Sequence, residues 1–257
     1  MDDNIIIHDR FSCNACADQG DLGFDFSMAF QPIVDCQNRR LFGYEALVRG
    51  LNGEPAGAVM AKVSDDNLYL FDQLCRVKAI ALAAELELTS ILSINFLPNA
   101  VYKPERCIRT TLSAAKAHNF PLERIMFEFT ESEQVRDSGV VKEIVEYYKR
   151  SGFLTAVDDF GAGYAGLGLL ADFQTNLVKF DMALIRNIER DYPRQRIVVN
   201  CLKLFEELGI TALAEGVETL EEMRWLTQAG VRLMQGYLFA KPGFESLPRV
   251  DMQLLDA

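Results

Sequence analysis

The sequence predicts an α/β fold, a modified TIM (β/α)8 barrel whose first strand runs antiparallel to the second. Eight short apolar runs follow one another along the chain, and helical patterns separate all but the first pair. Residues 34–40 alone join the first two runs, whereas a parallel crossover needs about a dozen residues. A chain of 257 residues is long enough for one such barrel.

Each of the eight apolar runs is predicted to form one strand. They are residues 28–33, 41–49, 91–97, 124–130, 154–159, 176–181, 210–215 and 231–236. The clearest helical stretches are residues 67–87, 137–150, 192–208 and 219–229. Residues 1–25 are rich in small, polar and acidic residues, so we expect a partly ordered extension there and a single domain over residues 26–257.

Charge and composition exclude several classes of protein. The formal net charge is −11, which disfavours a DNA-binding surface because phosphate backbones attract Lys and Arg. No apolar run is long enough to cross a bilayer, and the N-terminus lacks the basic-then-apolar pattern of a signal peptide. The six cysteines are scattered, as in a reduced protein without a disulfide framework. A cytoplasmic location without membrane insertion is therefore expected.

Polar side chains occur near the C-terminal ends of six predicted strands. Side chains alternate across a strand, so in the run RIMFEFT the carboxylate of Glu128 shares a face with Met126. Asp159 can join this face only if the chain leaves the strand, and Gly161 and Gly163 make such a bend easy. The residues that strand alternation directs toward one barrel mouth are Glu45, Asn95, Glu128, Asp158, Lys179 and Glu215.

This set of side chains predicts a site for divalent cations. Several carboxylates in one small cavity repel one another unless cations neutralise them. Carboxylate and amide oxygens suit hard ions such as Mg²⁺ or Mn²⁺, and two such ions can activate water and stabilise a phosphoryl leaving group. Each residue alone also fits a solvated rim position, a helix cap or an ion pair. The agreement of phase across six strands favours a shared site that receives an anionic substrate.

Eight short motifs occur in order along the chain. They are FQPI (30–33), EALVR (45–49), SIN (93–95), EFTE (128–131), DDFGAGY (158–164), KFD (179–181), AEGVE (214–218) and QGY (235–237). Together, over roughly residues 26–245, they resemble the EAL-domain family of cyclic di-GMP phosphodiesterases. The resemblance implies an EAL phosphodiesterase domain that hydrolyses cyclic di-GMP to linear 5′-pGpG and so lowers this second messenger in bacterial signalling.

The resemblance also implies two divalent cations, Mg²⁺ or Mn²⁺, and a role for each matching residue. The ligands of the first cation would be Glu45, Asn95, Glu128 and Asp158. The ligands of the second would be Asp158, Asp159 and Glu215. Catalysis would involve Lys179, which positions or polarises the attacking water, Glu215 as a candidate general base, and Glu131, which braces the loop after Asp159. Contacts to the substrate or support of the ligands would come from Gln31, Arg49, Asp181, Glu218 and Gln235.

The loop after Asp159 departs from the family pattern, with Ala162, Ala165 and Gly166 where many members have Thr and two Ser. In this family the loop links the dimer interface to the metal site, so a homodimer is expected, and a regulatory protein partner remains open.

The main alternative is a catalytically weak EAL module that binds cyclic di-GMP or a protein. A barrel hydrolase for another phosphodiester is a further alternative. The presence of every expected ligand favours the active enzyme.

Near the N-terminus, four residues could hold a zinc ion. They are His8, Cys13, Cys16 and Cys36. A single C-x2-C pair is a weak signal, so free thiols in a flexible arm are the favoured interpretation.

Overall fold

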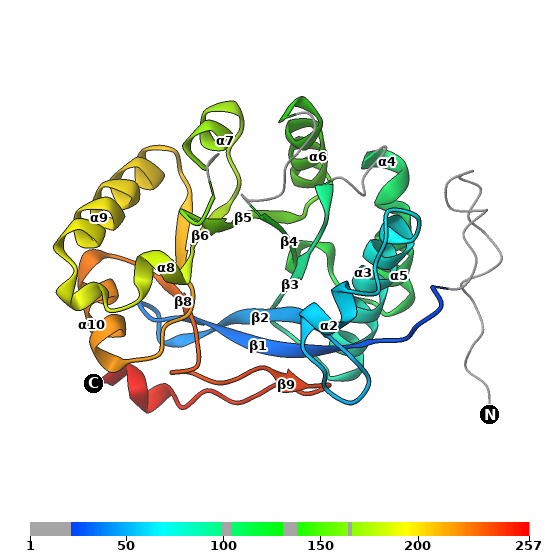
Figure 1. The fold of residues 1–257 in the computed structure, drawn as a ribbon, viewed down its shortest axis with the longest axis horizontal. Coiled ribbons are helices and arrows are strands. Elements are labelled where there is room, and N and C mark those ends of the chain that lie inside the picture. The colour runs from blue at the N-terminus through cyan, green and yellow to red at the C-terminus, as the bar shows by residue number, and fades with distance from the viewer. Residues whose placement is uncertain (1–21, 99–103, 131–137, 164–165, 257) are drawn as a thin grey trace.

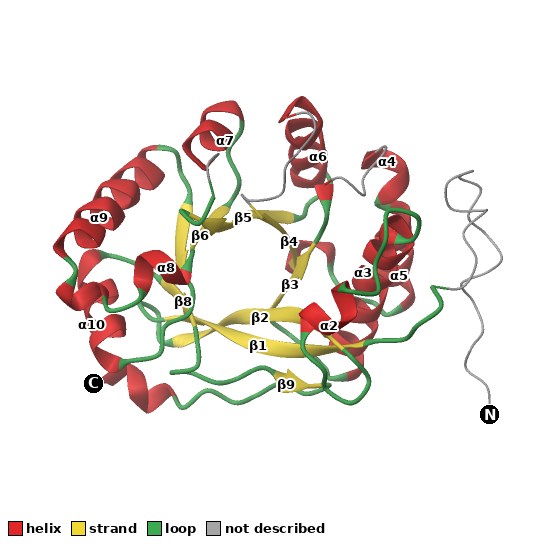
Figure 2. Cartoon of the chain, in the orientation of Figure 1, coloured by secondary structure: helices red, strands yellow, loops and turns green. Residues whose placement is uncertain are grey.

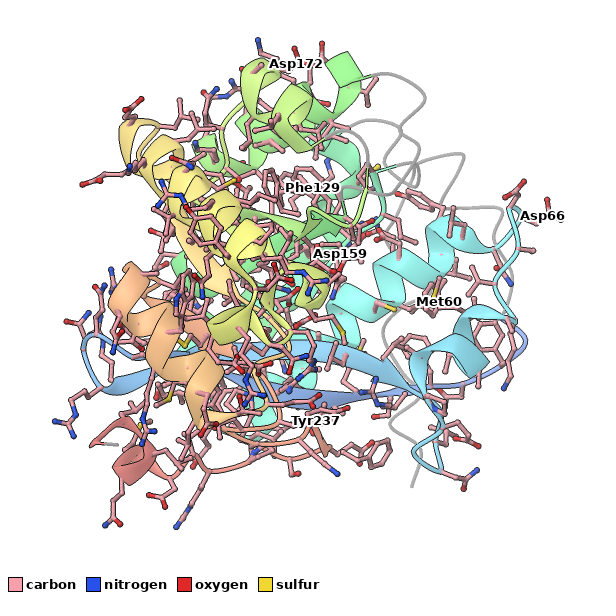
Figure 3. The ribbon with its side chains drawn as sticks, turned by 60° about the vertical axis from the view of Figure 1, so that its left-hand side comes forward. Met60, Asp66, Phe129, Asp159, Asp172 and Tyr237 are labelled. Atoms are coloured by element: carbon pink, nitrogen blue, oxygen red, sulfur yellow. The ribbon has the colours of Figure 1, made fainter. Side chains whose placement is uncertain are left out.

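The computed structural model describes residues 22–98, 104–130, 138–163 and 166–256. In these residues nine strands form one sheet, and eight of them close into a barrel. Helices lie around the outside of the strands, which enclose the centre of the view in Figure 1 and are drawn in yellow in Figure 2. The modified TIM barrel predicted from the sequence is confirmed.

The strands occupy the predicted segments, several with shorter bounds. They are β1 (Ser27–Asp35), β2 (Arg40–Arg49), β3 (Ile91–Asn95), β4 (Ile125–Thr130), β5 (Leu154–Phe160), β6 (Leu177–Phe180), β7 (Thr211–Ala214), β8 (Leu233–Gln235) and the short β9 (Gly243–Phe244). The strand order is β2-β3-β4-β5-β6-β7-β8-β1, and the pairing of β1 with β2 closes the ring.

Strand β1 is antiparallel to both of its barrel neighbours. It pairs with β2 in a register that sets Gln31 opposite Glu45, and with β8 in a register that sets Ile33 opposite Gln235. All other barrel pairs are parallel. The antiparallel first strand follows from the short turn after Asp35, which leaves no length for a crossover. Strand β9 adds to β1 as an antiparallel neighbour outside the ring.

Helices connect the parallel strands. The α-helices are α2 (Ala56–Met60), α3 (Leu68–Glu85), α4 (Pro104–Cys107), α5 (Arg109–Ala117), α6 (Ser138–Arg150), α7 (Gly166–Asp172), α8 (Met182–Ile185), α9 (Tyr192–Glu207) and α10 (Leu220–Ala229). Short 3₁₀ helices are η2 (Leu122–Arg124), η3 (Ile188–Arg190) and η4 (Met252–Asp256). Helices α3, α6, α9 and α10 match the four predicted helical stretches closely. No described helix combines the length and the apolar character that a membrane crossing requires.

The barrel interior is divided along its length into an apolar and a polar part. A small buried cluster fills the part nearer the strand beginnings; its members are Ile33, Met126, Ala156, Leu177, Leu213 and Leu233. Because side chains alternate, the residue two positions after each of the last five points the same way. Those residues are Glu128, Asp158, Lys179, Glu215 and Gln235. The apolar layer supports a polar layer at the C-terminal strand ends, where barrel enzymes carry their sites.

Candidate metal centre

Five carboxylates from four parts of the barrel, which are β2, β4, β5 and the end of β7, meet in two overlapping groups. The first carboxylate group consists of Glu45, Glu128 and Asp158, and the second of Asp158, Asp159 and Glu215. Within each group one oxygen per residue lies within 4.8 Å of the others. Asp158 belongs to both groups, which is the arrangement expected for two cations that share a bridging ligand.

A bulge in β5 allows neighbouring aspartates to face the same site. The register between β5 and β6 shifts between Val157 and Phe160, and Asp159 adopts a left-handed φ of 54°. The backbone N–H of Asp159 donates to Asp158 Oδ1 over 2.9 Å. The next turn needs the left-handed φ of 98° at Gly161. The chain therefore leaves the strand at this point, as the two adjacent aspartates require.

The amide of Asn95 lies next to the first carboxylate group. Asn95, the last residue of β3, donates from Nδ2 to Glu45 Oε1 over 2.9 Å. In strand register it sits opposite Glu128. Its amide oxygen thus belongs to the same set of oxygen donors.

The ammonium group of Lys179 lies in the middle of these carboxylates. Lys179 is fully buried, and its Nζ is 2.7 Å from Glu128 Oε2 and 2.7 Å from Glu215 Oε1. It is also 3.1 Å from Asp158 Oδ1 and 3.5 Å from Glu45 Oε2. One positive charge therefore bridges the two groups and holds four carboxylates at short range.

The carboxylates of the two groups carry more negative charge than the one ammonium of Lys179 can neutralise, and their pKa values reflect this imbalance. Burial raises the pKa of Glu128 to about 8; Lys179 opposes this rise, while Glu45 and Asp158 add to it. Burial also raises the pKa of Glu215 well above its usual range. Burial lowers the pKa of Lys179, but the surrounding carboxylates raise it by more, so the net pKa lies well above its usual value of 10.5. The site therefore favours additional positive charge.

The donor atoms fit divalent cations. Glu128 Oε1 is buried, and no described residue offers it a hydrogen-bond partner. A buried carboxylate oxygen without a partner is costly, and a cation would satisfy it. The donor set consists of carboxylate oxygens and one amide, which suits Mg²⁺ or Mn²⁺ better than soft metals.

Gln31 and Gln235 form a chain of hydrogen bonds behind Glu45. Gln235 Nε2 donates to Glu45 Oε2 over 2.8 Å and to Gln31 Oε1 over 3.2 Å. Gln31 Nε2 in turn donates to the carbonyl of Ala240 over 3.2 Å. Both amides are buried, so here they orient a carboxylate of the first group. The sequence offered the motif for each glutamine, but only the β1–β8 pairing shows that they bond to one another.

Other residues predicted to contact substrate lie at the rim. Arg49, at the end of β2, donates to the carbonyl of Val48 over 2.7 Å and is half-buried. Asp181 accepts from the backbone N–H of Ala183 and caps α8. Glu218 is exposed and pairs with a neighbouring arginine.

Three other predictions fall wholly or partly on residues that the structure leaves undescribed. Glu131 lies outside the described residues, as do His8, Cys13 and Cys16 of the zinc hypothesis, while Cys36 is buried beside β1. Most of the predicted N-terminal extension also falls outside them. These predictions stay predictions.

Comparison with known proteins places this site in a family. A family model described as EAL domain matches residues 20–242. The blue light- and temperature-regulated antirepressor BluF of Escherichia coli (strain K12) is 36% identical over 223 residues, which cover 86% of this chain and 55% of that protein. A probable cyclic di-GMP phosphodiesterase of the same organism, PdeN, is 30% identical over 229 residues, covering 84% of this chain and 43% of that protein. The chain spans about half the length of these curated relatives.

Solved structures agree with this match. A standalone versatile EAL protein from Vibrio cholerae O395, in its c-di-GMP bound form, shows 68% identity and a TM-score of 0.89, covering 92% of this chain and 100% of that chain. Klebsiella pneumoniae BlrP1, in a manganese/cy-diGMP complex, shows 35% identity and a TM-score of 0.82, covering 88% of this chain and 58% of that chain. Since the family model matches most of its length, the chain belongs to the EAL domain family.

Proposed function

We propose that this chain is a metal-dependent phosphodiesterase that hydrolyses cyclic di-GMP to linear 5′-pGpG. The observation that carries the proposal is the pair of carboxylate groups that share Asp158 around the buried ammonium of Lys179. The names of relatives support the substrate, since PdeN is a probable cyclic di-GMP phosphodiesterase and BlrP1 was solved with cy-diGMP and manganese.

Each carboxylate group would hold one cation, with the Asn95 oxygen completing the first. When bound, two Mg²⁺ or Mn²⁺ ions would supply a water of lowered pKa and positive charge beside the phosphoryl oxygens. Lys179 holds the carboxylates together and would place a fixed positive charge near the attacking water. Glu215, whose pKa is raised by burial, is suited to accept a proton from that water.

The reaction that follows from these roles is an in-line displacement at one phosphorus. The water oxygen bonds to phosphorus, the bond from phosphorus to the 3′ oxygen breaks, and that oxygen takes up a proton. The product is the linear dinucleotide with a 5′-phosphate. The guanidinium of Arg49 would pair with a phosphate oxygen, whereas Gln235 orients Glu45 and is itself bonded to Gln31.

Assembly and regulation belong to the same proposal. Leu167, in the first turn of α7, is 63% exposed, and α7 follows the Asp159 loop in sequence. An exposed leucine at this place supports homodimerisation through α7, which sedimentation at several protein concentrations would test. We place the enzyme in the cytoplasm.

One observation favours a second function. The relative BluF is described as an antirepressor, so the chain could act by binding cyclic di-GMP or a protein without cleavage. A metal titration of purified protein with cyclic di-GMP separates the two functions. We expect 5′-pGpG to appear only with Mg²⁺ or Mn²⁺. Binding without product at every metal concentration would establish the non-cleaving module, and equal turnover of unrelated diesters would contradict the substrate.

A further inference from the structure

The short helix α8 lies between the two loops that complete the second carboxylate group. It follows β6 directly and lies between the barrel strands and α9 in Figure 1. The N–H of Asp181, just before α8, donates to the carbonyl of Phe160 over 3.2 Å. On the other side, the N–H of Glu215 donates to the carbonyl of Phe180 over 3.1 Å. The chain that enters α8 is therefore bonded to both strand ends that carry the second group.

Side-chain atoms of α8 lie close to a glycine in each loop, although Met182 is itself 50% exposed. Gly216 has a φ of +66°, and a Cβ there would lie 2.6 Å from the Cβ of Met182. Gly161 has a φ of +98°, and a Cβ there would lie 2.4 Å from Cδ1 of Leu184. Both distances are far below van der Waals contact. Met182 and Leu184 thus contact the backbone beside Glu215 and beyond Asp159.

The C-terminal end of α8 is tied to the loop that follows β7. Arg186 pairs with Glu218 over 2.8 Å. The N–H of Asn187 donates to Glu222 Oε1 over 2.9 Å, and the other oxygen of this buried carboxylate accepts from the N–H of Glu218 over 2.9 Å. Because these bonds satisfy a buried charge, α8 cannot move away from the loop without a large cost.

We propose that Met182 and Leu184 are positioning residues that act as a spacer for the second carboxylate group. They fix the backbone that carries Glu215 and Asp159, and so set the distance between these ligands. Glu45, which belongs only to the first carboxylate group, has its own support in Asn95 and Gln235. This inference rests on the proposed function. It predicts that a change in the spacer lowers the affinity for one cation and leaves the affinity for the other unchanged.

The test measures Mn²⁺ binding to the full chain without substrate, by calorimetry and by electron paramagnetic resonance. Gly216→Ala should lower the affinity for one of the two ions by about tenfold or more, since support of a metal ligand commonly contributes that much. Met182→Gly in the same chain removes the opposing Cβ and should restore most of the affinity. Gly209→Ala is the matched control: its φ is +70°, and no described atom lies within 4 Å of an added Cβ. It should leave both affinities unchanged.

The outcomes separate this inference from the proposed function. A wild-type chain that binds fewer than two Mn²⁺ ions would overturn the two-cation site and the spacer with it. Two ions in the wild type, with equal affinities in Gly216→Ala or no recovery with Met182→Gly, would overturn the spacer alone. If Gly216→Ala does not fold, Leu184→Phe tests the other loop, because a larger ring presses against Gly161. It should weaken the same ion, and unchanged binding would overturn the inference.

Discussion

At the residue scale, one buried ammonium group holds together a site with an excess of negative charge. Lys179→Met keeps a side chain of similar length but leaves the four carboxylates around it without their counter-charge. We expect turnover of cyclic di-GMP at saturating Mn²⁺ to fall by about 10²-fold or more, as for loss of a preorganised charge at a reaction centre. Steady-state kinetics with product analysis measures this, and circular dichroism checks the fold.

Lys203→Met controls for the loss of a lysine. Lys203 is exposed on α9, outside both carboxylate groups, and its replacement should leave turnover within about twofold of the wild type, as for a typical surface change. Wild-type turnover in Lys179→Met would contradict the role of the buried ammonium.

Asp158 is shared by both carboxylate groups, whereas Glu45 belongs only to the first. Asp158→Asn should therefore lower the affinity for both Mn²⁺ ions. Glu45→Gln should lower the affinity for one ion and leave the affinity for the other close to the wild-type value. Each lost carboxylate should cost about tenfold or more in affinity. Calorimetric titration of the two variants measures the pattern, and an equal effect of both changes would speak against a bridging aspartate.

At the element scale, the sequence could predict the strands because their side-chain phase and connection lengths are local properties. The seven residues from 34 to 40 require a tight turn, and this alone predicts the antiparallel β1. The bend at Asp159 could also be predicted, since two adjacent aspartates can face one site only where the strand is interrupted, and Gly161 follows.

Contacts between distant elements could not be predicted in the same way. Helix α8 spans only Met182–Ile185, too short for a helical period to show, and its contact with Gly216 depends on how β6 and β7 pair. The bond from Gln235 to Gln31 depends on closure of the ring by β1, which joins residues far apart in sequence. The position of Lys179 among four carboxylates likewise follows from the closed barrel and not from any single strand.

Helix α10 begins with a capping box that also orders the loop after Glu215. The Thr219 hydroxyl accepts from the N–H of Glu222, and the Glu222 carboxylate in turn accepts from the N–H of Thr219. Thr219→Ala should lower the free energy of unfolding by about 1 kcal/mol, the usual cost of a lost cap. Urea unfolding measures the change. Thr227→Ala is the control in the same helix, since its hydroxyl donates to the carbonyl of Met223 within the helix and alanine favours the helix.

Equal losses of stability in the Thr219→Ala and Thr227→Ala chains would show that the capping box contributes nothing specific. Loss in Thr219→Ala alone would support it.

At the scale of the whole molecule, the barrel closes at β1, and an ion pair secures the seam beside β8. Asp35, whose side chain is fully buried, accepts from Arg232 Nη2 over 2.7 Å and from Nε over 3.0 Å. Burial raises the pKa of Asp35, but the bonds from Arg232 and Asn38 lower it more, to a net value of about 2. The folded-state pKa is thus below the unfolded value of 3.8.

This shift predicts a pH-dependent contribution to stability. Because the pKa is depressed, the stabilisation is present above about pH 4 and is lost as the pH falls through about 2. Asp35→Asn should therefore lower the free energy of unfolding by about 1–2 kcal/mol at pH 7, and by roughly half as much near pH 3. Urea unfolding of both chains at the two pH values gives the difference. A difference that does not change with pH would assign the loss to packing and not to the charge.

The same whole-molecule linkage should apply to the cations, because their ligands come from strands across the barrel. Glu45, Glu128 and Glu215 are separated in sequence and converge only in the folded chain, so Mn²⁺ should bind the folded state in preference to the unfolded state. At an ion concentration of about 100 Kd, one bound ion adds roughly 2.7 kcal/mol to the free energy of unfolding. We expect Mn²⁺ to raise the Tm and a chelator to reverse the rise. Asp158→Asn, which weakens both sites, should remove most of the response, and an undiminished rise in that variant would place the stabilising ions elsewhere.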